Sequence, residues 1–413
     1  TWVVGGALAF AGAMAYAELA ALRPKAGGEY VYLREAFGPL AAFLTGWTSF
    51  VAGFSGAIAT SAAVFVFYLG RFVPALGQAA AFFTVPVIPG VVTLTVSPST
   101  LTAVAVIFGM AWIHLRGVGP GRVFGDVLAA LKVSAFVTFI AIGFSWGVGS
   151  LANLAPSAPV VPSNWLLALI PVMFTYSGWN AASYVAEEIR EPGRNVPRAL
   201  AIGTGAVVIL YLLLNTLYLY VLPATQLGAV KGSVLDLVAD KLLGQAAGNI
   251  MGVVSIISLA ASISAMTFAG PRVYFAMARD GLFVAPAAQV HPRYRTPHIA
   301  ILAQAAWSSL LVLSAKADAL VTYTGFAIVL FSGVAVVALF VLRRREPNAE
   351  RPFRAWGYPL VPGLYVVASA AILISGLVGA PGPTGAGVLV MVAGAPIYLL
   401  LRKFGGAGAP DRG

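Results

Sequence analysis

Runs of about 20 mostly apolar residues recur along nearly the whole chain, and a run of that length can cross a bilayer as one α-helix. Hydrophobic residues make up 60% of the 413 residues and charged residues only 9%. A soluble domain usually carries about a quarter charged residues. Because one soluble core could not bury this much apolar surface, the sequence predicts an all-α, multi-pass membrane protein.

The apolar runs predict eleven membrane-spanning helices within a single transmembrane domain over residues 1–404. The expected spans are 1–22, 39–69, 101–118, 123–147, 165–187, 199–222, 247–278, 297–315, 318–342, 358–378 and 385–401. Pro86, Pro89 and Pro98 favour an extracellular loop rather than a helix over residues 85–100. The Gly-rich residues 405–413 are expected to form a disordered cytoplasmic tail.

The net charge of +11 is distributed unevenly between the connectors. Of the 25 Lys and Arg residues, Lys132 lies in the middle of a span and four lie in even-numbered connectors (Arg71, Lys231, Lys241 and Lys316), which leaves 20 in the odd-numbered connectors, at the span ends that adjoin them and in the tail. The positive-inside rule places those 20 and the C-terminus in the cytoplasm of a cell-membrane protein. The surplus charge is therefore a topology signal, and we expect no nucleic-acid partner.

The chain begins directly on an apolar run, with Thr1 followed by Trp2, and it lacks the basic start of a signal peptide. The charge pattern places this start outside the cell, an orientation that is difficult to reach without a signal sequence. We therefore expect one more helix upstream of Thr1, which would give twelve spans with both ends cytoplasmic.

The absence of cysteine excludes disulfides, thiolate metal sites and a disulfide-linked subunit. The three histidines argue against a histidine-based metal centre, so we expect no cofactor. The chain contains no glycine-rich phosphate loop and no nucleophile elbow. These observations argue against an enzyme and favour a protein that uses an ion or solute gradient.

The fifth expected span changes from apolar to polar at mid-membrane, where residues 175–180 read TYSGWN. Gly178 weakens a helix by about 1 kcal/mol relative to alanine, and Ser177 and Asn180 offer competing hydrogen bonds. Backbone can unwind at this depth only against protein or a water-filled cavity, where it can bind a charged solute. The alternative is that Gly178 only lets two helices pack closely.

Lys132 lies ten residues beyond Arg122 in the fourth expected span, or about 15 Å deeper along a helix. An ionisable residue at that depth is a functional candidate, and we expect it to take part in ion coupling. It could instead brace helices by bonding backbone carbonyls. Ser264 and Thr267, on one face of the seventh span, could contact Lys132 or an ion, or they could bond within their own helix.

Two further charged stretches are expected at the cytoplasmic membrane boundary. Residues 23–30 should end the first helix and begin an amphipathic stretch at that interface. Glu187 and Glu188 end the fifth span, where ion pairs with Arg190 and Arg194 are expected rather than acid–base chemistry.

Four sequence blocks spread over nearly the whole chain match a known pattern. Residues 16–38 read YAELAALRPKAGGEYVYLREAFG, 174–200 read FTYSGWNAASYVAEEIREPGRNVPRAL, 272–281 read RVYFAMARDG and 351–362 read RPFRAWGYPLVP. These blocks resemble the end of helix two, helix six, the end of helix eight and the tenth-to-eleventh loop of amino acid–polyamine–organocation permeases. Bacterial neutral amino acid transporters of that superfamily are the most similar type.

The resemblance implies the LeuT-type fold, with two inverted five-helix repeats and two further helices, and it makes the expected spans family helices 2–12. In that family the substrate carboxylate meets a break in helix one, a segment this chain does not contain. The substrate amine meets the break in helix six. Carried over, Phe174 would cover the site, Thr175 and Ser177 would supply carbonyls, and Gly178 and Asn180 would line the pocket.

The resemblance also matches Lys132 to the helix-five lysine of members that do not use sodium, where it bridges helices one and eight. We therefore expect a secondary active transporter that moves amino acids by alternating access, through proton-coupled symport or exchange. The break has no acidic residue and is followed by Ala181 and Ala182, which suits a neutral substrate. The alternatives are a sodium-coupled symporter and a transport-inactive truncated or sensor-like homologue.

Overall fold

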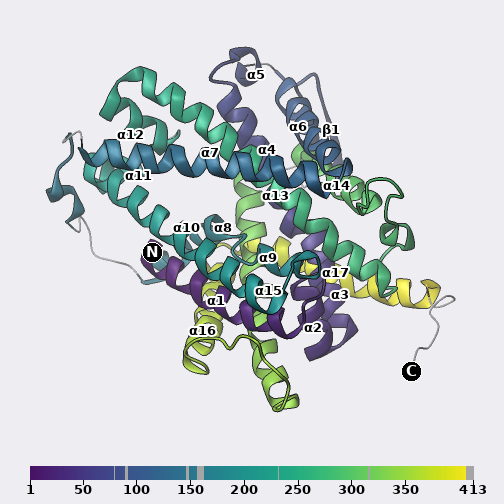
Figure 1. Ribbon diagram of the computed structural model, residues 1–413. Coiled ribbons are helices and arrows are strands. Elements are labelled where there is room, and N and C mark those ends of the chain that lie inside the picture. Colours follow the sequence, from purple (N-terminus) through teal and green to yellow (C-terminus); the bar gives the residue numbers. More distant parts are fainter. Residues whose placement is uncertain are drawn as a thin grey trace.

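The computed structural model describes residues 1–78, 80–88, 92–145, 148–155, 162–230, 232–314 and 317–405. It confirms the expected all-α architecture, with one small sheet at the periphery (Figure 1). The tail that was expected to be disordered, from residue 405 onward, lies outside the described residues except for Gly405 itself, at the end of the last helix.

The helices and strands follow one another along the chain as bundle helices joined by short connecting elements. Their bounds are α1 (Trp2–Leu22), α2 (Glu29–Phe37), α3 (Pro39–Thr48), η1 (Ser49–Gly53), α4 (Phe54–Leu69), α5 (Pro74–Gln78), β1 (Phe83–Ile88), β2 (Val92–Val96), α6 (Pro98–Leu115), α7 (Val118–Ser145), η2 (Leu151–Leu154), α8 (Pro162–Tyr176), α9 (Ala181–Tyr184), η3 (Ala186–Glu188), α10 (Pro192–Val221), α11 (Ala224–Gly228), α12 (Val234–Leu243), α13 (Gln245–Arg279), η4 (Ala285–Ala288), α14 (His298–Ser314), α15 (Ala317–Arg345), α16 (Leu360–Gly379) and α17 (Pro381–Gly405).

The eleven expected spans each coincide with helical structure. Within the described ranges, eight helices are long and apolar enough to cross a membrane, and two shorter apolar helices, Asn164–Tyr176 and His298–Ser314, match the fifth and eighth expected spans. The second span is continuous from α3 through the π-helical turn η1 into α4. The fifth is divided between α8 and α9.

The segment expected to be a loop over residues 85–100 forms an antiparallel hairpin of β1 and β2, followed by the start of α6. α6 begins at Pro98 because Ser97 and Thr100 form a reciprocal capping box. The hairpin lies beside α6 at one end of the bundle (Figure 1).

Burial separates the helices into an inner and an outer group. In an 18-residue apolar stretch of α1, 67% of the residues are buried, whereas the share in α7 is 17%. The corresponding stretches of α10 and α16 are also mostly exposed. The main core cluster draws residues from α1, α2, α8, α13 and α15. The mostly exposed apolar faces of the outer helices fit contact with lipid rather than water.

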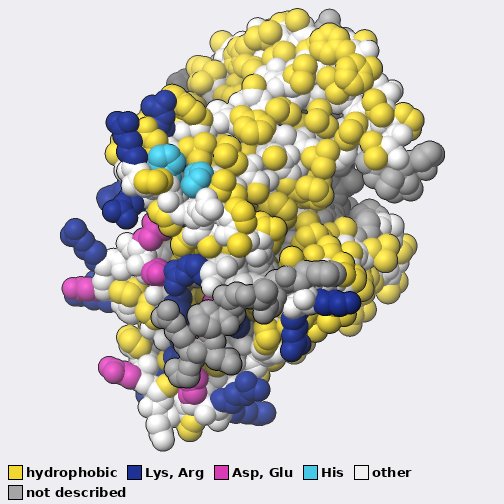
Figure 2. Space-filling view, turned by 90° about the vertical axis from the view of Figure 1, so that its right-hand side faces the viewer, with side chains coloured by type: hydrophobic (Ala, Val, Ile, Leu, Met, Phe, Trp, Pro, Cys, Tyr) yellow, Lys and Arg dark blue, Asp and Glu magenta, His cyan; other side chains and the backbone are white. Residues whose placement is uncertain are grey.

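Lys and Arg side chains gather along one side and the lower part of the face in Figure 2, and hydrophobic side chains cover most of the rest. Ion pairs link the connectors that follow α1, α13 and α15. Arg23 pairs with Glu346 at 2.6 Å, and Arg34 pairs with Asp280. These three connectors therefore lie at the same end of the bundle, which we call the basic end.

Candidate functional site

The helix expected over residues 165–187 is interrupted where the sequence turns polar. Gly178 has a φ of +94°, a conformation that glycine adopts without the strain of a Cβ. Turn hydrogen bonds run from Ser177 N to Phe174 O (3.0 Å) and from Ala181 N to Gly178 O (2.9 Å). A Cβ built on Gly178 would meet no atom within 4 Å, so close helix packing does not explain this glycine.

The five predicted pocket residues have different surroundings. Phe174, Ser177 and Asn180 are half-buried, whereas Thr175 and Gly178 are exposed. The Thr175 hydroxyl donates to the carbonyl oxygen four residues earlier in its own helix at 2.8 Å. The backbone beside Gly178 borders open space. The break therefore presents main chain, rather than charged side chains, to that space.

An aromatic cluster adjoins the α8 side of the break, and the sequence did not indicate it. The hydroxyl of Tyr211, from α10, donates to the Thr175 carbonyl at 3.2 Å. The rings of Trp2, Tyr176 and Tyr211 contact one another pairwise, with centroids 5.1–5.8 Å apart. Tyr211 thus holds one of the two carbonyls that were predicted to face the substrate.

The α9 side of the break is joined to the connector between α1 and α2 through Asn180. Its Nδ2 donates to Glu29 Oε1 at 2.9 Å and to the Tyr184 hydroxyl at 3.0 Å. Glu29 begins α2, a helix in the stretch expected at the membrane interface, and most residues of α2 are buried within the protein. α2 packs against α3 and α15, and its charged sequence did not indicate these contacts.

Lys132 lies half-buried in the middle of α7. Among the residues that the structure describes, it makes no hydrogen bond and no ion pair. α7 packs against α13, the helix that carries Ser264 and Thr267. Lys132 therefore lies on a helix that packs against α13, but its side chain has no bonded partner among the described residues. Its coupling role stays a prediction.

The two hydroxyls predicted to contact Lys132 are engaged elsewhere. Ser264 Oγ lies 2.8 Å from Nε2 of His114, which is buried near the end of α6. Thr267 Oγ1 donates to Ile263 O at 2.8 Å, the backbone alternative that the sequence left open. The structure thus brings Ser264 to a histidine that the sequence did not connect with it.

A sequence model described as "Amino acid permease" matches residues 1–401. The chain belongs to the amino acid permease family. Curated relatives agree: Asc-type amino acid transporter 1 of Mus musculus is 29% identical over 406 residues, covering 97% of this chain and 73% of that protein. Large neutral amino acids transporter small subunit 2 of Mus musculus is 29% identical over 410 residues, with the same two shares.

A bacterial relative, the serine/threonine exchanger SteT of Bacillus subtilis (strain 168), is 26% identical over 404 residues, covering 97% of this chain and 88% of that protein. The family and these relatives are transporters rather than enzymes. The permease is therefore an all-α, multi-pass membrane transporter of the amino acid–polyamine–organocation superfamily.

The acidic pair that ends the fifth span of this permease does not pair with the arginines that were expected. Glu188 accepts from Arg272 at 3.0 Å, and Glu187 pairs with Arg279 at 3.3 Å, so both partners come from α13. The expectation of ion pairing holds, but Arg190 and Arg194 were the wrong partners. These bonds fix the inner end of the broken helix to α13.

A second carboxylate at the basic end of the permease is completely buried. Glu18, in α1, pairs with Arg343 at 2.6 Å and with Arg351 at 3.2 Å, and it accepts from the Ala355 amide at 2.7 Å. Two guanidinium groups and a backbone amide compensate the desolvated charge. This cluster ties α1 to the connector between α15 and α16.

Proposed function

We propose that this permease carries neutral amino acids by alternating access at the break in residues 177–180. The observation that carries the proposal is the open backbone turn at Gly178, which follows α8 directly. The last carbonyls of a helix have no partner in that helix, so they can accept hydrogen bonds from a substrate ammonium group. Phe174, half-buried at the end of α8, is proposed to cover such a substrate.

A neutral substrate is favoured by the charges around the break. Residues 174–182 contain no charged side chain. The acid nearest to the break by hydrogen bonding, Glu29, is already bonded to Asn180 and Tyr16. A cationic side chain would therefore find no free carboxylate there. One relative is named for large neutral amino acids and another for serine and threonine, which supports the same substrate class.

The coupling is proposed to be exchange or proton symport through Lys132, with Ser264 and Thr267 on the adjacent helix. An intramembrane ammonium can occupy the place of a bound cation, and its deprotonation can empty that place. A relative named as an exchanger supports exchange in particular. The basic end is proposed to face the cytoplasm, with the C-terminus on that side of the cell membrane.

Transport by the full-length protein in liposomes tests the proposal. Labelled serine and leucine should enter vesicles preloaded with unlabelled amino acid faster than empty vesicles, and replacing sodium by choline should leave uptake unchanged. Near-complete loss of uptake in choline would establish sodium symport instead. Substrate binding without flux in either medium would identify a sensor-like homologue and overturn the proposal.

A further inference from the structure

The connector between α1 and α2 is fastened to the inner half of the broken helix. Gly27 N donates to Tyr184 O at 3.1 Å, and Ala26 N donates to Glu187 Oε2 at 3.0 Å. Gly28 has a φ of +51°, and a Cβ built there would lie 2.6 Å from the Tyr184 ring. The connector can approach this closely because residues 27 and 28 are glycines.

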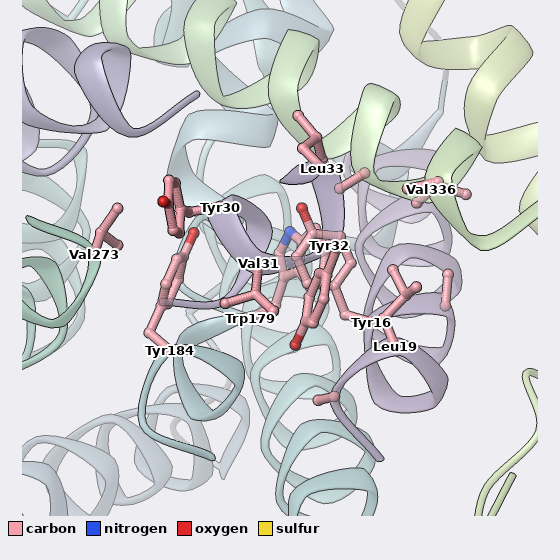
Figure 3. Packing of buried hydrophobic residues seen from close by; sticks show 14 of the residues in the cluster. Tyr16, Leu19, Tyr30, Val31, Tyr32, Leu33, Trp179, Tyr184, Val273 and Val336 are labelled. Carbon is pink, nitrogen blue, oxygen red and sulfur yellow. The ribbon is translucent and has the colours of Figure 1, made fainter. Parts of the chain in front are cut away.

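Glu29 follows these glycines, and its carboxylate points into the junction. Its side chain is buried, with 7% of the residue exposed. The Tyr16 hydroxyl, from α1, donates to Oε1 at 2.6 Å, and Asn180 Nδ2 donates to the same oxygen at 2.9 Å. Figure 3 shows Tyr16, Tyr32 and Trp179 close together, with Tyr184 beside Tyr30 on the other side of Val31.

The donors to Glu29 come from two bodies, the helix α1 and the short segment after the break. Tyr16 belongs to the long, mostly buried helix α1, whereas Asn180 belongs to the short segment after the break. A carboxylate accepts several hydrogen bonds more strongly than a neutral carboxyl group does, because charge-assisted bonds are about twice as strong. Its charge therefore determines how firmly the two bodies are joined.

Two cations of the basic end, Arg23 and Arg279, are paired with other acids. Arg279 pairs with Glu187, and Arg23 pairs with Glu35 and Glu346. Within the described ranges, no Lys, Arg or His is paired with Glu29. Burying a carboxylate without a cation is costly, and the alternative to a charge is a bound proton.

Tyrosines are the titratable groups that face Glu29. They come from α1 (Tyr16), α2 (Tyr32), α9 (Tyr184) and α16 (Tyr365). Burial raises the pKa of Glu29 above its usual value, and hydrogen bonds from Tyr16, Tyr184 and Asn180 lower it only in part. A carboxylate with these neighbours can exchange a proton when the junction moves.

We propose that Glu29 is a proton-binding site of the inner gate, distinct from Lys132. When it is deprotonated, it joins Tyr16 to Asn180 and holds the inner half-helix closed. When it binds a proton, the bonds from Tyr16 and Asn180 lose their charge assistance and weaken, and the inner half-helix is released. Because Asn180 is also a predicted pocket residue, proton binding at Glu29 acts on the substrate site. This inference rests on the alternating access proposed above.

Because the chain contains no cysteine, a single reporter thiol can follow the gate. Ala182→Cys places it on the half-buried inner half-helix. Its labelling by a membrane-impermeant maleimide is measured from pH 8 to pH 5 on the full-length protein in detergent. Each rate is divided by the rate of the denatured protein at the same pH, which removes the titration of the thiol itself. Labelling should rise about tenfold toward acidic pH, the order of change expected when hydrogen bonds to a charged group lose their charge assistance.

Two variants and one control test whether Glu29 is responsible. Glu29→Gln should label at the high rate at every pH. Tyr16→Phe removes one donor to the carboxylate, so its transition should move to higher pH. Glu350→Gln changes an exposed acid and should keep the original profile. A pH profile in Glu29→Gln that matches the parent, or a flat profile in the parent, would overturn the proposal. Labelling requires no transport, so a transport-inactive protein with the expected profiles would count only against the proposed function.

Discussion

Asn180 Nδ2 donates to Glu29 Oε1 at 2.9 Å, which joins the break in the fifth span to a connector 151 residues earlier in the chain. The Asn180 amide also donates to the Tyr184 hydroxyl, so both of its protons are used within the inner half of the molecule. This bond links the predicted substrate pocket to the basic end, and it leads to the first prediction.

Asn180→Asp places a second carboxylate within hydrogen-bonding distance of Glu29. Two carboxylates at this distance repel each other when both are charged, so one of them holds a proton with a raised pKa. A raised pKa makes the paired state stable at acidic pH and weakens it as pH rises. The ratio of variant uptake to parent uptake should therefore be highest near pH 5, where one proton joins the two carboxyl groups, and about tenfold lower at pH 7.5, equivalent to one pKa unit of interaction. A pH profile identical to the parent would contradict the link, and the exposed Asn348→Asp serves as the control.

Lys132→Ala should abolish coupled flux while leaving the protein folded, because the side chain makes no hydrogen bond to any described residue. Lys132→Arg keeps a permanent charge and should hold the carrier in one conformation. Exchange in liposomes and its pH profile measure both effects. Lys25→Ala, at a side chain that is 65% exposed, should have no effect. Unaltered uptake with an unaltered pH profile in Lys132→Ala would remove Lys132 from the coupling mechanism.

Gly178→Ala tests whether the backbone of the break is functional. A Cβ at Gly178 meets no neighbour, so the substitution acts only through the positive φ, at a cost of about 1–2 kcal/mol. Uptake and thermal stability should both fall. Gly203→Ala is the matched control, since Gly203 also has open space but lies within α10, where alanine is favoured by about 1 kcal/mol. Equal behaviour of the two variants would show that the turn is not required.

Phe174→Ala should raise the apparent KM for substrate several-fold, because the half-buried ring at the end of α8 is expected to cover the bound amino acid. Loss of a buried aromatic side chain removes up to about 3 kcal/mol of contact. Concentration dependence of initial uptake measures the change. Phe82→Ala, at an exposed ring before β1, should leave KM unchanged. An unchanged KM in Phe174→Ala would exclude the covering role.

The apolar runs of the sequence were sufficient to predict the spans, because membrane insertion depends on the hydropathy of each local segment. The break at Gly178 was also predictable, since glycine and the polar residues beside it weaken a helix wherever they occur. The family blocks extended the prediction to Phe174, Ser177 and Asn180 as pocket residues, and these roles stay predictions.

Side-chain partners could not be predicted in the same way. The sequence paired Glu187 and Glu188 with arginines a few residues away, whereas the structure pairs them with α13. It grouped Ser264 with Lys132, whereas Ser264 contacts His114 from α6.

The buried state of Glu29 is a further example, because its sequence neighbourhood is that of an interfacial connector. Only the packing of α1, α2 and the segment after the break removes its carboxylate from water. The sequence by itself determined which segments form long apolar helices and where one of them breaks, since those properties arise within a single helix. Tertiary structure alone decided which polar groups meet, because that depends on which faces of distant helices pack together.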